Sequence, residues 1–305
     1  MMKETQGILL ESGTNELEII TFKVGVNLFS INVMKVKEII HSSEVTSIPE
    51  SHPAVEGILQ VRGEIIPVIN LAKALGISSH VSKENSKFII TELNHTKVVF
   101  RVDDVHRIQR ISWKQIEEPS SLAMGLETTT AGIVKLDNTI ILMLDYEKII
   151  YEISPNNNMV IKDKSLLDKR KNERKGKIIY IAEDSAMLRQ VIKDTLESAG
   201  YENLTFFKNG EEALIRIEEL ASNKNSKITD SVNLLITDIE MPKMDGHHLT
   251  KRLKESENTK ELPIVIFSSL ISNELYHKGT SVGADAQITK PEITELINTI
   301  DNLLF

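Results

Sequence analysis

Four short apolar runs in the C-terminal part of the chain each end in a polar side chain suited to phosphate chemistry. The residues at these ends are Glu183 with Asp184, then Asp238, Ser268 and Lys290. Continuous Val, Ile and Leu runs are typical of parallel strands that are buried on both faces. Because ligands of open α/β sheets bind beyond the carboxyl ends of the strands, we expect these side chains to converge at one edge. The pattern predicts a site for a divalent cation and a phosphoryl group.

The three carboxylates fit a magnesium site. Mg²⁺ takes oxygen ligands in near-octahedral geometry, and it commonly binds one or two carboxylates together with waters and phosphate oxygens. A divalent ion would also relieve the repulsion among Glu183, Asp184 and Asp238. Asp238 has a second candidate role, since a carboxylate can attack phosphorus to form an aspartyl phosphate. Lys290 would then pair with a phosphate oxygen, and Ser268 would donate a hydrogen bond to the phosphoryl group.

Acidic residues at strand ends also serve as helix caps or as solvated loop charges. Glu183 and Asp184 alone fit either interpretation, whereas the whole set in this order favours a site. Asp245 begins an Asp-Gly turn signal and is expected to cap a helix rather than bind the ion. His247 and His248 are predicted to have surface roles rather than to accept phosphate.

The composition indicates a soluble protein with two domains. The 305 residues suffice for two cores, and 41% hydrophobic with 26% charged residues is ordinary for globular proteins. A formal charge of -8 argues against nucleic-acid binding. The absence of cysteine excludes disulfides, a thiol nucleophile and a Cys-based zinc site. No apolar run has the length of a membrane span or a signal peptide, so we expect an intracellular protein.

The sequence divides into a tail at 1–14, a first domain at 15–154, a linker at 155–176 and a second domain at 177–305. The linker is rich in Asn and then basic, with eight Lys and Arg against three acids in 162–177. Such a segment buries too little apolar surface to order itself. We interpret it as a solvated tether, with docking to an acidic partner as the alternative.

The first domain is rich in strand signals. Short strands joined by hairpin turns predict a barrel or a sandwich. The sequence of this domain offers no candidate nucleophile or base, so we do not expect it to be catalytic. Residues 33–40 have the apolar spacing of a short helix. The predicted strands and hairpins lie at 18–24, 27–31, 55–69, 87–102 and 131–144.

In the second domain the pattern changes to strands alternating with helices. Five such units predict a parallel sheet with helices on both faces. Ser185 and Asn209 are expected to cap the first two helices, and Gly200 to end the first of them.

The second domain resembles the receiver domain of two-component response regulators. The resemblance rests on Ala182–Ser185, Asp238–Gly246 and Ile288–Pro291. It implies a flavodoxin-like (βα)5 fold with strand order 2-1-3-4-5. It also implies that Asp238 accepts phosphate from a kinase histidine.

The same resemblance implies a full set of site residues. Gln287 departs from the family, which often has an aromatic switch residue there, so another element must carry the signal. Leu270 and Glu240 occupy positions that tune phosphate loss in the family. The implied Mg²⁺ ligands are Glu183, Asp184, Asp238 and the backbone carbonyl of Glu240, with Ser268 and Lys290 at the phosphoryl group.

The first domain resembles a CheW-type chemotaxis coupling domain. The matching stretches are 22–39, 57–71 and 103–105, of which the second contains the pattern Arg-Gly-x-x-x-Pro-x-x-x-Leu. The resemblance implies an all-β fold of two small barrels side by side, without catalysis. It places Val36, Gly57 and Arg62 near partner surfaces, whereas core packing, a turn glycine and a solvated charge are their structural alternatives.

The order of the two domains is similar to that of CheV-type chemotaxis coupling proteins. This resemblance implies a cytoplasmic, non-enzymatic adaptor that is recruited to membrane receptor arrays without inserting into the membrane. Its partners would be the cytoplasmic tips of chemoreceptors and a CheA-type histidine kinase, and not DNA. Phosphorylation of Asp238 would regulate coupling, through adaptation or as a phosphate sink, and the receiver could autodephosphorylate. The alternatives are a scaffold that is never phosphorylated and a response regulator with another output.

Overall fold

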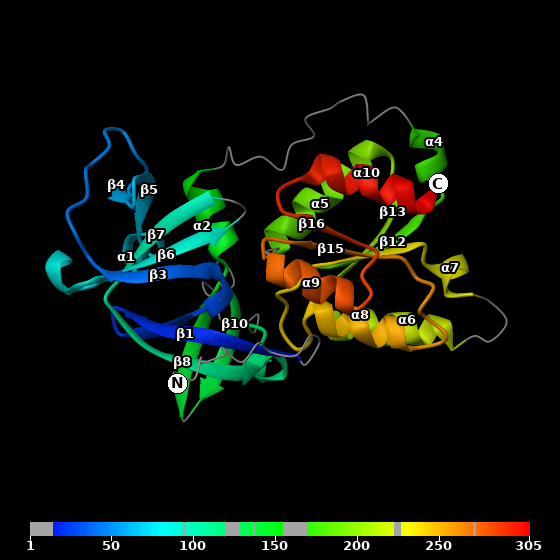
Figure 1. Cartoon of the computed structure of the whole chain (residues 1–305), viewed down its shortest axis with the longest axis horizontal. Helices are drawn as coiled ribbons and strands as arrows, with labels where there is room; N and C mark the ends of the chain where they lie inside the picture. Colours follow the sequence, from blue (N-terminus) through cyan, green and yellow to red (C-terminus); the bar gives the residue numbers. More distant parts are fainter. Residues whose placement is uncertain are drawn as a thin grey trace, which may run out of the picture.

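The computed structural model describes residues 15–93, 96–119, 129–136, 138–154, 170–222, 227–270 and 273–305. The predicted tail and most of the predicted linker lie outside the described residues, as do the turn residues Asn94, His95 and Asp137 of two predicted hairpins. Figure 1 shows two domains side by side, the first rich in strands and the second a sheet with helices on both faces. Within the described ranges, no helix is both long and apolar enough to cross a bilayer.

The first domain is all-β apart from short helices. Its strands are β1 (Glu16–Val24), β2 (Asn27–Asn32), β3 (Val36–His41), β4 (Val55–Val61), β5 (Glu64–Asn70), β6 (Lys87–Leu93), β7 (Thr96–Val102), β8 (Asp104–Ser112), β9 (Ile116–Glu117), β10 (Thr130–Leu136) and β11 (Thr139–Leu144). Its helices are η1 (Val33–Lys35), α1 (Leu71–Ala74), η2 (Lys83–Asn85), η3 (Trp113–Gln115) and α2 (Tyr146–Ile153).

These strands form two sheets, in the orders β8-β1-β2-β11-β10-β9 and β3-β6-β7-β5-β4. Alternating side chains bury both faces of each sheet. In β1, Phe22 and Val24 face the core between the sheets, whereas Leu17 and Ile19 pack with Trp113 in a second cluster. The five-stranded sheet likewise has its own cluster around Phe88. A shared core plus one cluster for each sheet agrees with the predicted all-β double unit.

The predicted helix at 33–40 is wrong. Only η1 is helical, and Val36 begins β3, which pairs antiparallel with β6. Exposure alternates along β3, which is the period of a strand, and its β-branched residues favour pleated sheet. The strand β8 and the helix α2 were not predicted from the sequence.

The second domain has the predicted parallel sheet. Its strands are β12 (Ile178–Ala182), β13 (Asn203–Phe207), β14 (Leu234–Thr237), β15 (Ile264–Ser268) and β16 (Ala286–Thr289). The order β13-β12-β14-β15-β16, with all pairs parallel, is the expected 2-1-3-4-5. The helices are α4 (Lys171–Arg174), α5 (Ala186–Ala199), α6 (Gly210–Ala221), α7 (Ile228–Ser231), α8 (Gly246–Glu255), α9 (Asn273–Ser281) and α10 (Ile293–Leu304).

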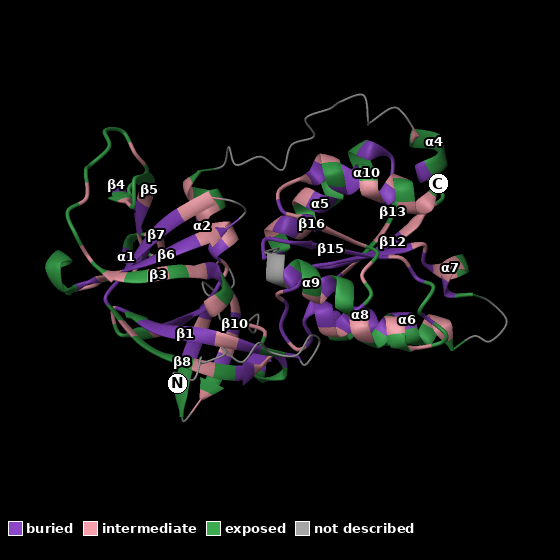
Figure 2. Cartoon of the chain, in the orientation of Figure 1, coloured by how far each residue is buried: buried purple, intermediate pink, exposed green. Residues whose placement is uncertain are grey.

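Helices cover both faces of this sheet. The apolar residues of α5 and α10 pack in one cluster with β12, β14 and β15, and those of α6 and α8 in another. Figure 2 shows the resulting buried strands between the helices. The predicted caps are present: Ser185 accepts from the Leu188 amide at 3.4 Å, and Asn209 from the Glu212 amide at 2.9 Å. Gly200 ends α5 in the left-handed conformation, as predicted.

Residues 170–176, predicted as the end of the tether, pack on the second domain. The Arg174 side chain in α4 is fully buried, and its guanidinium donates to the Asp301 carboxylate at 2.9 and 2.6 Å. It also donates to the carbonyl of Ala199 at 2.7 Å and lies over the ring of Tyr201. A basic residue that looked solvated in the sequence is therefore an anchor.

Candidate functional site

The ends of three parallel strands bring an ammonium group between two carboxylates. Lys290 follows β16, and its Nζ lies 2.8 Å from Glu183 Oε2, beyond β12, and 2.8 Å from Asp238 Oδ2, beyond β14. Lys290 has no exposed surface, and the two acids are 1% and 5% exposed. The other Asp238 oxygen accepts from the Ile239 amide at 2.6 Å. The predicted convergence of these residues at one sheet edge is what the structure shows.

Asp184 completes a cluster of carboxylates. One ligand atom from each of Glu183, Asp184 and Asp238 lies within 4.8 Å of the others. Burial raises the pKa of Glu183 to about 7, although Lys290 lowers it. Burial, and then Glu183 and Asp238, raise the pKa of Asp184 well above its ordinary value. Hard oxygen donors that are costly to ionise together suit a small divalent cation, which would remove that cost.

Burial would lower the pKa of Lys290, but Asp238 and Glu183 raise it well above its ordinary value. The amine is therefore an ammonium at neutral pH. A fixed positive charge beside Asp238 is suited to neutralise charge that gathers on a transferred phosphoryl group.

Ser268 stands at the carboxyl end of β15 and is fully buried. Its hydroxyl accepts a hydrogen bond of 3.3 Å from the amide of Leu270. The next residue, Ser269, turns instead toward the first domain, where its hydroxyl donates to the carboxylate of Glu147.

The turn at Asp245 and Gly246, where α8 begins, packs against the backbone of Asp238. Asp245 is the N-cap of α8, as predicted, and accepts from the His248 amide at 2.8 Å. A Cβ at Gly246 would collide with the carbonyl oxygen of Asp238, so only glycine fits there. The surface role predicted for His247 is wrong: its side chain is buried, and burial, followed by the charge of Lys278, lowers its pKa to about 4. It lies on the inner side of α8.

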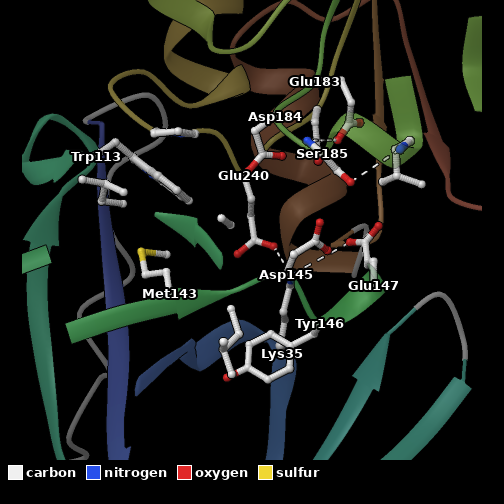
Figure 3. A pocket seen from close by; sticks show the side chains of 16 residues that line it. Lys35, Trp113, Met143, Asp145, Tyr146, Glu147, Glu183, Asp184, Ser185 and Glu240 are labelled. Carbon is white, nitrogen blue, oxygen red and sulfur yellow. Dashed lines mark hydrogen bonds and ion pairs between the residues drawn. The ribbon is translucent and has the colours of Figure 1, made fainter. Parts of the chain in front are cut away.

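The first domain supplies one wall of this site. A cavity of about 50 Å³ is lined by residues of both domains, and Figure 3 shows Lys35 and Glu147 of the first domain and Glu183 and Glu240 of the second around it. Lys35 forms an ion pair with Glu240, whose second oxygen accepts from Asn32 Nδ2 at 2.9 Å. Glu147 lies 3.9 Å from Lys290 and 3.9 Å from Lys35.

Local sequence explains how the first domain presents these residues. Asp145 caps α2 by accepting from the Lys148 amide at 2.9 Å, and the Tyr146 hydroxyl donates to the Ser30 carbonyl at 3.0 Å. These contacts fix the first turn of α2, which carries Glu147. Asn32 caps η1, which carries Lys35. An Asp followed by apolar residues at helical spacing is a sequence signal for α2, but no local signal indicates its contact with the other domain.

The loop after β14 docks on the first domain. Lys243 donates its amide to the Trp113 carbonyl at 2.9 Å, and its own carbonyl accepts from Asn15 Nδ2 at 2.9 Å. Asn15 Oδ1 in turn accepts from the Asp245 amide at 3.0 Å. The only tryptophan of the chain therefore lies at the domain boundary, where it also lines the cavity.

Comparisons with known proteins agree with this architecture. A family model described as the CheW-like domain matches residues 18–154, and one described as the response regulator receiver domain matches 179–301. The chain is 31% identical over 303 residues to chemotaxis protein CheV3 of Helicobacter pylori, covering 95% of each protein. The chain belongs to the CheV family of chemotaxis proteins. The CheV family thus accounts for both predicted domains and their order.

Two further relatives are consistent with the assignment. CheV2 of Helicobacter pylori is 27% identical over 301 residues, which cover 92% of this chain and 93% of that protein. Chemotaxis protein CheW of Thermotoga maritima is 34% identical over 145 residues, which cover 48% of this chain and 95% of that protein.

Three residues of this CheV-family chain were predicted near partner surfaces. Val36 is half-buried at the start of β3. Gly57 is a buried residue of β4 with φ +144, and a Cβ there would collide with the carbonyl of Thr46, which agrees with a backbone role. The Arg62 side chain is 79% exposed and pairs with Glu38 at 3.0 Å. Of the three, only Arg62 has an exposed, charged side chain.

Gln287, where the receiver family often has an aromatic residue, is tied to α9. Its Nε2 donates to the Tyr276 carbonyl at 2.7 Å and to the Thr280 hydroxyl at 3.3 Å. The side chain thus ties β16 to α9.

Proposed function

We propose that this protein is a cytoplasmic chemotaxis adaptor whose receiver domain accepts a phosphoryl group on Asp238. The observation that carries the proposal is the Lys290 ammonium between Asp238 and Glu183, next to a third carboxylate, in a chain that also has a CheW-like domain. Phosphoryl transfer requires positioning and neutralised charge more than covalent chemistry from the protein. These residues supply both.

The donor is a phosphohistidine of a CheA-type kinase. An oxygen of Asp238 attacks phosphorus, the bond between phosphorus and the imidazole nitrogen breaks, and that nitrogen keeps the electron pair. Lys290 pairs with an oxygen of the transferred group, and the Ser268 hydroxyl donates a hydrogen bond to it. Hydrolysis by water later returns the free carboxylate.

Glu183, Asp184 and Asp238 would hold Mg²⁺, with the backbone carbonyl of Glu240 as a further ligand. The closely spaced oxygens of these three side chains, of which Glu183 and Asp238 are buried and Asp184 is half-buried, fit that hard cation. When bound, Mg²⁺ would neutralise charge on the phosphoryl oxygens.

The CheW-like domain would couple the cytoplasmic tips of chemoreceptors to the kinase, which places the protein at membrane receptor arrays. The names of the relatives support a role in chemotaxis. Arg62, at an exposed hairpin turn, is the proposed contact residue, with Val36 and Gly57 shaping the surface beneath. Neither domain contributes an enzymatic output or a DNA-binding role.

Phosphotransfer from a purified, phosphorylated CheA-type kinase tests the proposal. The full chain should take up label in the presence of Mg²⁺, and Asp238→Asn should not. The variant Lys290→Met is a further test: it should be labelled slowly, and circular dichroism should show that it is folded. Labelling of Asp238→Asn at the wild-type rate would reject Asp238 as the acceptor.

A scaffold that is never phosphorylated is the second candidate, because one observation favours it. The first domain covers the site, and Lys290 has no exposed surface. If the wild-type chain took no label from a kinase that labels another receiver, the scaffold would be the better account.

A further inference from the structure

Glu147 places a carboxylate from the first domain in front of the phosphorylation site. Its Oε2 lies 3.9 Å from Lys290 Nζ, and its Oε1 accepts from the hydroxyl of Ser269. The side chain is 9% exposed, so it is buried between the domains. A buried carboxylate is stable only where cations and donors offset its lost hydration.

The cation that Glu147 approaches is the one that a phosphoryl group on Asp238 would use. Lys290 Nζ is already 2.8 Å from Asp238, and it is the cation expected to bind the transferred group. The Glu147 carboxylate approaches the same ammonium from the opposite domain. Both are anions that use the same cation, and both Glu147 and Asp238 line the same cavity of about 50 Å³.

A second buried ion pair holds the two domains in this arrangement. Lys35 pairs with Glu240, two residues after Asp238, and Asn32 donates to the same carboxylate. The side chain of Lys35 is 9% exposed and that of Glu240 is 14% exposed. Lys35 also faces Glu147 at 3.9 Å, so its charge serves both carboxylates. The loop contacts of Asn15 and Trp113 with Lys243 and Asp245 join the same two domains.

We propose that Glu147 is an internal stand-in for the phosphoryl group, and that its seating in the receiver site and phosphorylation of Asp238 exclude each other. The proposal rests on the proposed function, because it describes how the same site is regulated. In the docked form, Glu147 and Lys35 close the site. Phosphorylation adds negative charge at Asp238, repels Glu147 and separates the domains. Docking of the domains and phosphorylation of Asp238 are thermodynamically linked. Contacts that hold the domains together therefore disfavour phosphorylation, and phosphorylation favours separation of the domains.

This arrangement also offers a route for the signal in a chain that has Gln287 where the receiver family often has an aromatic switch residue. The signal would pass through the interface above Asp238 rather than through Gln287. Separation would uncover Lys35, η1 and the start of α2, which are surfaces of the CheW-like domain.

Trp113 reports this separation without a label. It is the single tryptophan, the residue is 4% exposed, and it lines the shared cavity. Opening would uncover the part of its indole that faces the shared cavity, while the first domain's own cluster still covers the rest, and would increase quenching by acrylamide.

The test compares the full chain with Glu147→Gln, Lys35→Ala and the control Glu152→Gln. Glu152 lies on the same helix, α2, but is exposed. Acetyl phosphate with Mg²⁺ is the phosphodonor: an Asp238 oxygen attacks phosphorus, the bond to the acetate oxygen breaks, and acetate leaves with the electron pair. We expect Glu147→Gln and Lys35→Ala to be labelled about tenfold faster than wild type, and Glu152→Gln at the wild-type rate. Both fast variants should show stronger quenching of Trp113 before any phosphodonor is added.

Wild type should show that same increase in quenching only after beryllofluoride and Mg²⁺ are added as a phosphoryl mimic. Equal labelling and equal quenching of wild type and Glu147→Gln would overturn the inference and leave the proposed function standing. If no variant took label, including Glu147→Gln, the proposed function itself would fail and this inference with it. Circular dichroism of each variant excludes misfolding as the cause of increased quenching.

Discussion

Replacing Arg174 tests whether the chain before β12 is a structural part of the second domain. The Arg174 guanidinium is fully buried, and its two bonds to Asp301 at 2.9 and 2.6 Å form a bidentate pair. Arg174→Met removes the cation, leaves the partly buried Asp301 carboxylate without it, and leaves the Ala199 carbonyl without this donor. Losing one partner of a buried pair costs about 3 to 5 kcal/mol. The Tyr201 hydroxyl still donates to Asp301 at 2.6 Å, so we expect about 3 kcal/mol, the lower end of that range.

The loss can be measured as the free energy of opening of the second domain, from hydrogen exchange of peptides in β12 and α10 in the intact protein. The matched control is Arg216→Met, because Arg216 forms an exposed pair with Glu219 at 3.1 Å. Exposed ion pairs add little to stability, so we expect this variant to keep the wild-type free energy of opening. The double variant Arg174→Met with Asp301→Leu should recover part of the loss, since apolar residues often replace a buried ion pair at little cost. If Arg174→Met cost no more than Arg216→Met, the segment would be the solvated tether that its composition suggests.

Three further predictions concern the receiver. Lys290→Met should slow labelling of Asp238 by about 10²- to 10³-fold, which is the loss typical of one preorganised charge-stabilising donor. Calorimetry should still detect Mg²⁺ binding by this variant. An unchanged labelling rate would show that Lys290 has no part in the mechanism. Chelating divalent ions should abolish labelling and adding Mg²⁺ should restore it, whereas equal labelling in excess chelator would argue against the ion. His247, whose pKa burial lowers from 6.5 to about 4, contributes stability that is present above pH 6.5 and is lost as pH falls toward 4. The loss of stability should reach about 3 kcal/mol, at about 1.4 kcal/mol per pKa unit. Urea titrations at several pH values should show that the free energy of unfolding depends less steeply on pH in His247→Asn than in wild type.

The architecture of the second domain could be predicted because its strands are buried on both faces. Such strands are continuous apolar runs, and the polar residues that follow them must lie at one edge of the sheet. The positions of Glu183, Asp238 and Lys290 follow from that rule alone. Ser185 and Asn209 were predictable as caps because an N-cap depends on local sequence.

The errors occurred where local pattern and tertiary context disagree. Residues 33–40 have apolar spacing that fits a helix, but pairing with β6 outweighs that weak preference. His247 was predicted to be a surface residue because of its position on the third helix of the domain, but it lies on the inner side of α8 and is buried. Arg174 looked solvated because its neighbours are basic, but it finds Asp301, which is 127 residues away in the sequence.

The contribution of the first domain to the site could not be predicted at all. Glu147 and Ser269 are 122 residues apart in the sequence, and no local sequence pattern around either residue predicts their contact. Docking of one domain on another depends on the shapes of two folded surfaces, which periodicity and capping signals do not encode. Trp113 illustrates the point, since it belongs to the first domain in sequence and yet lines the shared cavity.

The most direct test of the central claim is to identify the residue that carries the phosphoryl group. Borohydride reduces an aspartyl phosphate to homoserine, so mass spectrometry of the phosphorylated, reduced full chain can locate the modified position. We predict homoserine at position 238 after incubation with phosphorylated kinase and Mg²⁺, and none in a sample without the donor. Homoserine at position 184 or at another aspartate, or hydroxynorvaline (the product from a glutamyl phosphate) at position 183, with Asp238 unmodified, would contradict the account.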